Sequence, residues 1–257
     1  MPFEVTTRKH GHVGEIHFSA PPHNFASSGM LCAIADAIYE MDTDDGIRCI
    51  LLTAEGKVFC GGADLAGADA VQGADGMSEI ALFYENAGRI MNRKKVMIAA
   101  VQGAAIGAGL GLALAADFRI ASPAARFSAN FVKLGFHPGF AITYTLPRAV
   151  GEQKASWMML SGNRIKAEEA EKWGLADRLV AAEELSAEAL VMAEEIACNA
   201  PLALLAIRKT LASEVGGKAA ETMRHEHTEQ TKLKGTADYA EGVAAVFERR
   251  TANFAGR

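Results

Sequence analysis

Residues 96–111 read VMIAAVQGAAIGAGLG and join a short apolar run to a glycine-rich turn. The run at 96–101 predicts a buried strand, because it is continuously apolar and a turn follows it. The glycines leave backbone N–H groups that no side chain covers. A helix that opens directly after them turns its N-terminal dipole toward the same place, which favours an anion. The stretch therefore predicts a strand–turn–helix unit whose turn faces a ligand.

A second turn of the same kind lies earlier in the chain. Residues 59–65 read FCGGADL and follow a buried strand predicted at 47–53. One N–H group from each turn can hold a single developing negative oxygen, as oxyanion holes do. The two turns together predict a site that stabilises an oxyanion.

Strands and helices alternate on both sides of these turns, which indicates an α/β fold with parallel strands and right-handed crossovers. Period-two alternation around Gly11 predicts a hairpin, and helical spacing predicts two helices, the first capped by Ser27 or Ser28. The predicted elements are strands at 3–6, 12–18 and 118–120 and helices at 28–41 and 77–91.

The last third of the sequence is almost entirely helical in its spacing. Pro201 is placed to start a helix, and Gly216-Gly217 is expected to separate two more. We therefore divide the chain into an α/β core at 1–195 and a helical C-terminal region at 196–257.

Composition narrows the class of protein. The chain has 257 residues and a formal net charge of -5, which argues against a nucleic-acid partner because such partners need a basic face. Cys32, Cys49, Cys60 and Cys198 form no Cys-x-x-Cys motif, so we expect free thiols in a reducing cytoplasm. The first residues carry neither a basic cluster nor an apolar run, so we expect no secretory signal.

Residues 97–116 form an uncharged stretch long enough for a membrane span. However, the stretch consists mostly of alanine and glycine, begins like a strand and has no asymmetric basic flank. We expect no membrane association.

Taken together, these turns and several later motifs resemble the enoyl-CoA hydratase/isomerase (crotonase) superfamily. The order and spacing agree over nearly the whole chain. The later motifs are LGFHPG at 134–139, RAVG at 148–151, AEEA at 167–170, WGLAD at 173–177 and FERRTANF at 247–254. The resemblance implies a crotonase-like (ClpP/crotonase) ββα spiral core with a helical C-terminal trimerisation region, and homotrimers that often pair as hexamers.

The resemblance also implies a chemistry. An acyl-CoA thioester would place its carbonyl between the N–H groups of Ala63 and Ala108, with coenzyme A arriving as part of the substrate and no permanently bound cofactor. The coenzyme A contacts implied by motif position are Pro22, His23, Phe25, Asp64, Leu65 and Arg249.

Hydration of an enoyl thioester usually needs two carboxylates to move the protons. The positions that match the two family glutamates are Gly111 and Phe131, and neither side chain transfers a proton. His137 and Glu85 are the candidate replacements, and a neutral imidazole can act as a base near neutral pH. Two alternatives stay open: a non-catalytic acyl-CoA-binding protein, and a carbon–carbon bond (diketone) hydrolase that uses His137.

Other sites are disfavoured by spacing. Gly107, Gly109 and Gly111 do not form the Gly-x-Gly-x-x-Gly pattern of dinucleotide loops. His225 and His227 are two residues apart, so on a helix they point in different directions, and we expect no metal site.

Overall fold

The structure is a computed structural model that describes residues 2–64 and 79–257. A six-stranded sheet has the order β1-β2-β3-β5-β7-β10, and a four-stranded sheet has the order β4-β6-β8-β9. The strands are β1 (Glu4–His10), β2 (Val13–Ser19), β3 (Cys49–Ala54), β4 (Val58–Cys60), β5 (Val96–Val101), β6 (Ala104–Ile106), β7 (Phe118–Ala121), β8 (Arg126–Ser128), β9 (Ile165–Lys166) and β10 (Arg178–Leu179).

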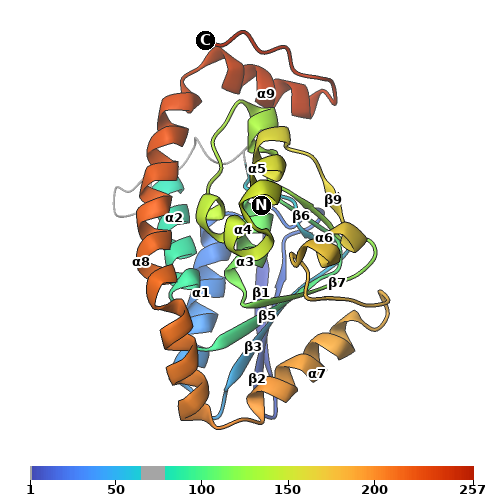
Figure 1. Ribbon diagram of the computed structural model, residues 1–257, viewed down its shortest axis with the longest axis vertical. Coiled ribbons are helices and arrows are strands. Elements are labelled where there is room, and N and C mark those ends of the chain that lie inside the picture. Colours follow the sequence, from blue (N-terminus) through green and yellow to red (C-terminus); the bar gives the residue numbers. More distant parts are fainter. Residues whose placement is uncertain (1, 65–78) are drawn as a thin grey trace.

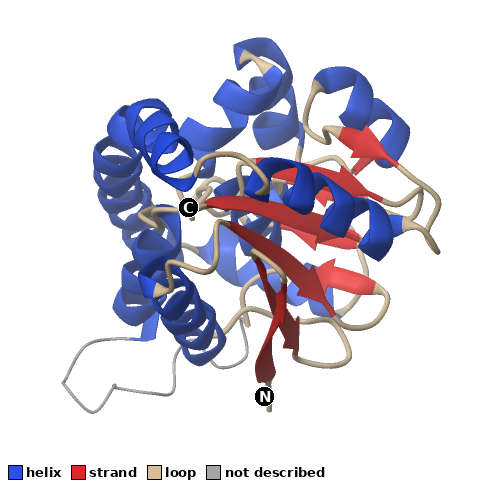
Figure 2. Ribbon diagram, turned by 90° about the horizontal axis from the view of Figure 1, so that it is seen from below, coloured by secondary structure: helices blue, strands red, loops and turns tan. Residues whose placement is uncertain are grey.

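Helices surround both sheets (Figures 1 and 2). They are α1 (Ser28–Thr43), α2 (Glu79–Met91), α3 (Ala108–Ala115), α4 (Ile142–Val150), α5 (Glu152–Ser161), α6 (Ala167–Trp173), α7 (Leu185–Ala197), α8 (Pro201–Lys234) and α9 (Ala237–Phe247), with a 3-10 helix η1 (Asn130–Leu134). The mixed α/β class and the parallel central strands predicted from the sequence are confirmed.

The first hairpin and the first helix form where the sequence predicts them. β1 and β2 are an antiparallel hairpin in which His10 pairs with Val13. Ser27 caps α1 by accepting a hydrogen bond from the Met30 N–H at 3.2 Å. Both features match the prediction.

The parallel strands β3, β5 and β7 of the large sheet are buried on both faces, as expected for parallel strands, while the antiparallel edge strand β1 is mostly exposed. On one face Ile16, Phe18 and Leu52 join the main core with α1 and the small sheet. Phe18 of β2 meets Phe59 of β4 edge to face at 5.4 Å. On the other face, Leu51 and its neighbours pack against α7. Alternate side chains of one strand therefore serve two different cores.

The small sheet was not predicted. Its strands have three residues or fewer, too short to show the alternation on which strand prediction depends. The residues of β4 and β6 were interpreted only as parts of the glycine-rich turns. This sheet matters because it fixes where those turns lie.

The predicted break at Gly216-Gly217 is wrong, because α8 runs unbroken over 34 residues. Each glycine inside a helix costs about 1 kcal/mol, but tertiary contacts hold α8 on both sides of the pair. Arg208 donates to Asp117 at 3.2 Å in the first half. Glu226 contacts the turn before α4 in the second half. The start of the helix at Pro201 is confirmed, while the division of the chain at residue 195 remains a prediction.

Residues 97–116 do not form one helix but divide into β5, β6 and α3. Within the described ranges no single helix is long and apolar enough to cross a membrane. One pair, Leu185–Ala197 with Pro201–Ala212, has sufficient length and composition together but is bent by 102°.

Candidate active site

The two glycine-rich turns contact each other. β4 and β6 are parallel neighbours, so the turns that follow them leave the same edge of the small sheet. A Cβ atom at Gly109 would lie 2.1 Å from the Cys60 carbonyl oxygen, so the second turn approaches the first as closely as backbone allows. Only glycine fits at position 109.

We expect Gly109→Ala to lower the free energy of unfolding by about 2 kcal/mol, the usual cost of overpacking. Gly217→Ala is the control, since a Cβ there would meet nothing within 4 Å. Because that glycine lies inside α8, alanine should instead stabilise the protein by about 0.5–1 kcal/mol. Urea unfolding of both variants measures the two effects, and equal midpoints would contradict the proposed close approach.

The N–H groups of Ala63 and Ala108 take no part in the described hydrogen bonds of the fold. Ala63 pairs with Ala26 in an isolated bridge. That bridge uses the Gly62 carbonyl at 2.8 Å and the Asp64 N–H at 3.0 Å, and leaves the Ala63 N–H out. Ala108 is the first residue of α3, where helix N–H groups have no intrahelical acceptor. Among the described residues, neither N–H has a hydrogen-bond acceptor.

Cys60 lies behind the first turn and is fully buried. Burial raises the pKa of its thiol to about 11, so it stays protonated near neutral pH. Cys60 is therefore a packing residue and not a nucleophile. All four cysteines are free, as predicted.

The predicted coenzyme A contacts gather beside the first turn. The Gly61 N–H donates to the His23 carbonyl at 2.9 Å, and the rings of His23 and Phe25 lie 5.5 Å apart. Buried Asn24 fixes this loop by donating to the Val58 carbonyl at 2.8 Å.

The remaining predicted contacts lie differently. Pro22 is exposed in the same loop, and Asp64 is half-buried beside Ala63. Leu65 lies outside the described residues. Arg249 is exposed just after α9, and no described hydrogen bond, ion pair or ring contact joins it to the loop at 20–26.

Two aromatic side chains flank the second turn at the positions relevant to proton transfer. Phe131, which occupies one matched glutamate position, has its ring edge 3.6 Å from where a Cβ at Gly107 would lie. Phe140 packs against Gly111, the other matched position, with its Cβ 2.5 Å from a would-be Cβ. Phe131 is 8% and Phe140 1% exposed. The aromatic rings therefore line this turn together with one polar atom, the Asn130 Oδ1, which lies 3.4 Å from where a Cβ at Gly107 would be.

The turn that carries Phe140 is strained and is held by a buried carboxylate. Phe140 and Ala141 have φ values of 63° and 57°, which cost about 1–2 kcal/mol each for residues other than glycine. Glu226 of α8 accepts hydrogen bonds from the Ala141 N–H at 2.8 Å, the Thr143 N–H at 3.0 Å and the Thr143 hydroxyl at 2.6 Å. Three donors on one carboxylate hold the turn in place.

A second residue of α8 holds the same turn. Gln230 donates to the His137 carbonyl at 2.9 Å and accepts from the Tyr84 hydroxyl at 2.9 Å. Burial raises the pKa of Glu226 to about 7, and burial together with Glu226 raises the pKa of Tyr84.

Glu226, Gln230 and Phe140 were not predicted from the sequence. The signal in the sequence was that Glu226 and Gln230 share a helical face with the apolar Met223. The structure shows that all three are buried. A carboxylate on the buried face of a helix indicates a fixed hydrogen-bonding role.

The two proposed proton-transfer residues lie in different surroundings. His137 is half-buried, and its Nδ1–H donates to the Pro138 carbonyl at 2.8 Å. Its ring lies 5.9 Å from that of His225 on α8. Glu85 is exposed on α2, and no described residue forms a hydrogen bond or ion pair with its side chain.

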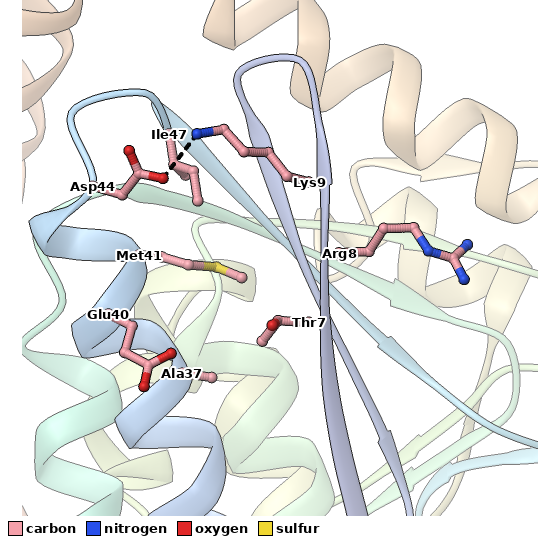
Figure 3. A pocket seen from close by; sticks show the side chains of 8 residues that line it. All are labelled: Thr7, Arg8, Lys9, Ala37, Glu40, Met41, Asp44 and Ile47. Atoms are coloured by element: carbon pink, nitrogen blue, oxygen red, sulfur yellow. Dashed lines mark hydrogen bonds and ion pairs between the residues drawn. The ribbon is translucent and has the colours of Figure 1, made fainter.

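Two hollows elsewhere do not coincide with these turns. One, of about 330 Å³, lies between β1 and α1, where Lys9 reaches Asp44 at 2.8 Å while Arg8 points away (Figure 3). It lies at the opposite end of α1 from Ala26. The other, of about 500 Å³, contacts the C-terminal end of α3 and the first turns of α8. The turns are thus distinct from both.

Comparisons with known proteins identify the family of the chain. The family described as Enoyl-CoA hydratase/isomerase matches residues 8–257. The 1,2-epoxyphenylacetyl-CoA isomerase of Escherichia coli K12 is 34% identical over 238 residues, covering 91% of each chain.

Solved structures are similar over almost the full length. An enoyl-CoA hydratase/isomerase from Pseudoalteromonas atlantica T6c has a TM-score of 0.88 at 31% identity, covering 98% of this chain and 99% of that one. A carnitinyl-CoA hydratase from Mycobacterium avium has a TM-score of 0.82 at 28% identity, covering 98% of each. The chain belongs to the enoyl-CoA hydratase/isomerase (crotonase) family.

Proposed function

We propose that the protein is an enzyme that binds an acyl-CoA thioester and stabilises an enolate or tetrahedral oxyanion between the N–H groups of Ala63 and Ala108. The main support for this proposal is that neither N–H group has a hydrogen-bond acceptor among the described residues. The two turns that carry these groups are also in direct contact. The N-terminus of α3 adds its dipole at the same place. Donors fixed in this way stabilise charge without reorganising during the reaction.

The reaction that fits this site best is isomerisation, decarboxylation or hydrolysis rather than hydration. Phe131 and Phe140 occupy the surroundings of the turn where a hydratase would need carboxylates and an ordered water. An enolate or oxyanion needs only the two donors and one proton-transfer group.

His137 is our candidate for that group. Because a carbonyl only accepts, the bond to Pro138 requires the proton on Nδ1. The neutral ring then has its lone pair on Nε2, which is the form that a general base needs. Glu85 is the weaker candidate because it is exposed and held by no described partner.

If His137 is the base, His137→Ala should lower kcat about 100-fold, within the usual range for general base catalysis. The pH dependence of the rate should also change. His225→Ala is the matched control, because His225 is an exposed histidine next to it on α8. An unchanged rate and pH dependence in His137→Ala would remove His137 from the mechanism.

A diketone hydrolase that acts through the same His137 tautomer is the second candidate. Calorimetric titration with coenzyme A, acyl-CoAs, enoyl-CoAs and a β-diketone, followed by mass analysis of each mixture, separates the possibilities. Tighter binding of a thioester than of coenzyme A, with a changed product, supports the proposal. Binding without any change indicates a non-catalytic acyl-CoA-binding protein. Binding and cleavage of the diketone alone favour the second candidate.

We also propose that the chain forms homotrimers, alone or paired as hexamers, in the cytoplasm. Leu202, Ile207 and Leu211 are 79%, 58% and 71% exposed on α8, which supports a subunit interface there. The four free thiols support a reducing compartment.

A further inference from the structure

We propose that Phe140 determines acyl specificity by closing the site beside the α-carbon of the substrate, and that Glu226 is the positioning residue that keeps Phe140 there. This inference rests on the proposed function, because it requires a thioester carbonyl at the Ala63 and Ala108 N–H groups.

Phe140 lies one helical turn from the second donor. Gly111 follows Ala108 by three residues in α3, so both lie on one face of the helix, about 4.5 Å apart along its axis. Phe140 covers that face at Gly111, with its Cβ and Cγ 2.5 and 2.6 Å from where a Cβ would be. In our proposal the thioester carbonyl is held at the Ala108 N–H and the α-carbon lies beside this face of α3, where the ring of Phe140 limits the room.

The ring has no freedom to move aside. Phe140 is 1% exposed, and Phe83 of α2 meets it edge to face at 6.0 Å. The preceding residue, Gly139, is enclosed, since a Cβ there would lie 2.6 Å from the Tyr84 hydroxyl and 2.7 Å from the Gln230 amide. The turn is thus fixed from α2 on one side and from α8 on the other.

The carboxylate of Glu226 is what holds the unfavourable backbone. Phe140 and Ala141 both have left-handed φ values, which side-chain-bearing residues avoid. Both Glu226 oxygens are occupied, one by Ala141 and the other by Thr143. An amide at position 226 presents only one acceptor, so one of the two N–H donors would face an NH₂ group. The turn would then relax and Phe140 would leave Gly111.

The consequence is a preference for acyl groups without a branch at the α-carbon. One added methyl group in a tight apolar pocket changes recognition by about 10- to 200-fold. The parent protein should therefore bind butanoyl-CoA at least tenfold more tightly than 2-methylbutanoyl-CoA.

Calorimetric titration of the full chain with these two thioesters tests the assignment of Phe140. Phe140→Ala should bring the ratio of the two dissociation constants close to one, and Phe140→Leu should lower it by an intermediate factor. The leucine variant keeps most of the packing, so it answers the question even if the alanine variant does not fold. If the folded variants keep the parent ratio, the assignment of Phe140 is overturned.

Glu226→Gln tests the positioning role through the same ratio at pH 8, where the Glu226 side chain of the parent is ionised and both oxygens accept. It should shift the ratio in the direction of Phe140→Ala and have no further effect when combined with that variant, because it acts only through Phe140. Glu221→Gln, an exposed change on the same helix, should keep the parent ratio. A merely structural role for Glu226 predicts equal loss of affinity for both thioesters, and that result would overturn the positioning role.

The parent protein separates failure of this inference from failure of the proposed function. If it binds neither thioester more tightly than coenzyme A, the proposed function fails and the inference fails with it. If it binds both equally well, the proposed function stands and the inference alone is overturned.

Discussion

Ala63→Pro should lower kcat on a CoA thioester substrate roughly 100- to 1000-fold, the loss that follows removal of one oxyanion donor. Proline has no N–H, so the substitution deletes the donor itself. It breaks no hydrogen bond of the fold, because the bridge to Ala26 uses the carbonyl of Gly62 and the N–H of Asp64. The residue before the new proline is Gly62, which tolerates the restriction that proline imposes.

Ala63→Gly is the matched control, because it changes the side chain and keeps the N–H. It should retain kcat within a few-fold. Thermal unfolding of both variants shows whether the turn persists. If Ala63→Pro stays folded and turns over at nearly the parent rate, Ala63 is not an oxyanion donor.

The stability of the protein should fall as pH rises, because of Glu226. Its pKa is raised from 4.5 in the unfolded chain to about 7 in the folded protein. Between these values the folded state binds more protons than the unfolded state, so the free energy of unfolding decreases with increasing pH. At 1.36 kcal/mol per pKa unit the decrease from pH 5 to pH 8 is about 3 kcal/mol.

Denaturant unfolding at several pH values, compared between the parent and Glu226→Gln, isolates this contribution. The difference between the two should change by about 3 kcal/mol over that range, and Glu221→Gln should follow the parent. Tyr84 of α2, His137 in the turn, and His225, His227 and Glu229 of α8 are the other titratable groups nearby. The histidines and Glu229 are present in both proteins, so their contributions largely cancel. Tyr84 is coupled to Glu226, but its pKa is raised above its ordinary value near 10, so it does not titrate between pH 5 and pH 8. Parallel pH curves for the parent and Glu226→Gln would contradict the raised pKa.

Helices and strands could be predicted from the sequence where they are long enough to show a hydrophobic periodicity. The hairpin around Gly11, the buried strand at 96–101 and the Ser27-capped helix all formed as predicted. The short strands at 58–60 and 104–106 could not be predicted, because three residues show no periodicity. The break predicted at Gly216-Gly217 was wrong for another reason. The helix propensity of glycine favours a break there, but the tertiary contacts of Arg208 and Glu226 stabilise α8 on both sides of the pair.

The candidate site was predictable only where it is local in sequence. Each glycine-rich turn could be found by itself, and the structure adds that Gly109 meets Cys60. Their role as donors stays a prediction. The clamp on Phe140 could not be found, because it joins Ala141 to Glu226 across 85 residues. No spacing rule covers that distance, and a single sequence gives no sign of which buried glutamate pairs with which turn.

The distance of 85 residues between Ala141 and Glu226 in the sequence has a consequence during translation. At 5–20 residues per second, the ribosome makes the turn at 139–143 roughly 4–17 s before Glu226. The strands β9 and β10 are made within that interval, and α2 is made before it. Until α8 is made, the turn has its contact with Phe83 of α2 but lacks the hydrogen bonds to Glu226. We therefore expect the position of Phe140 to become fixed only after α8 has been synthesised, so the last part of the chain to be made completes the proposed acyl site.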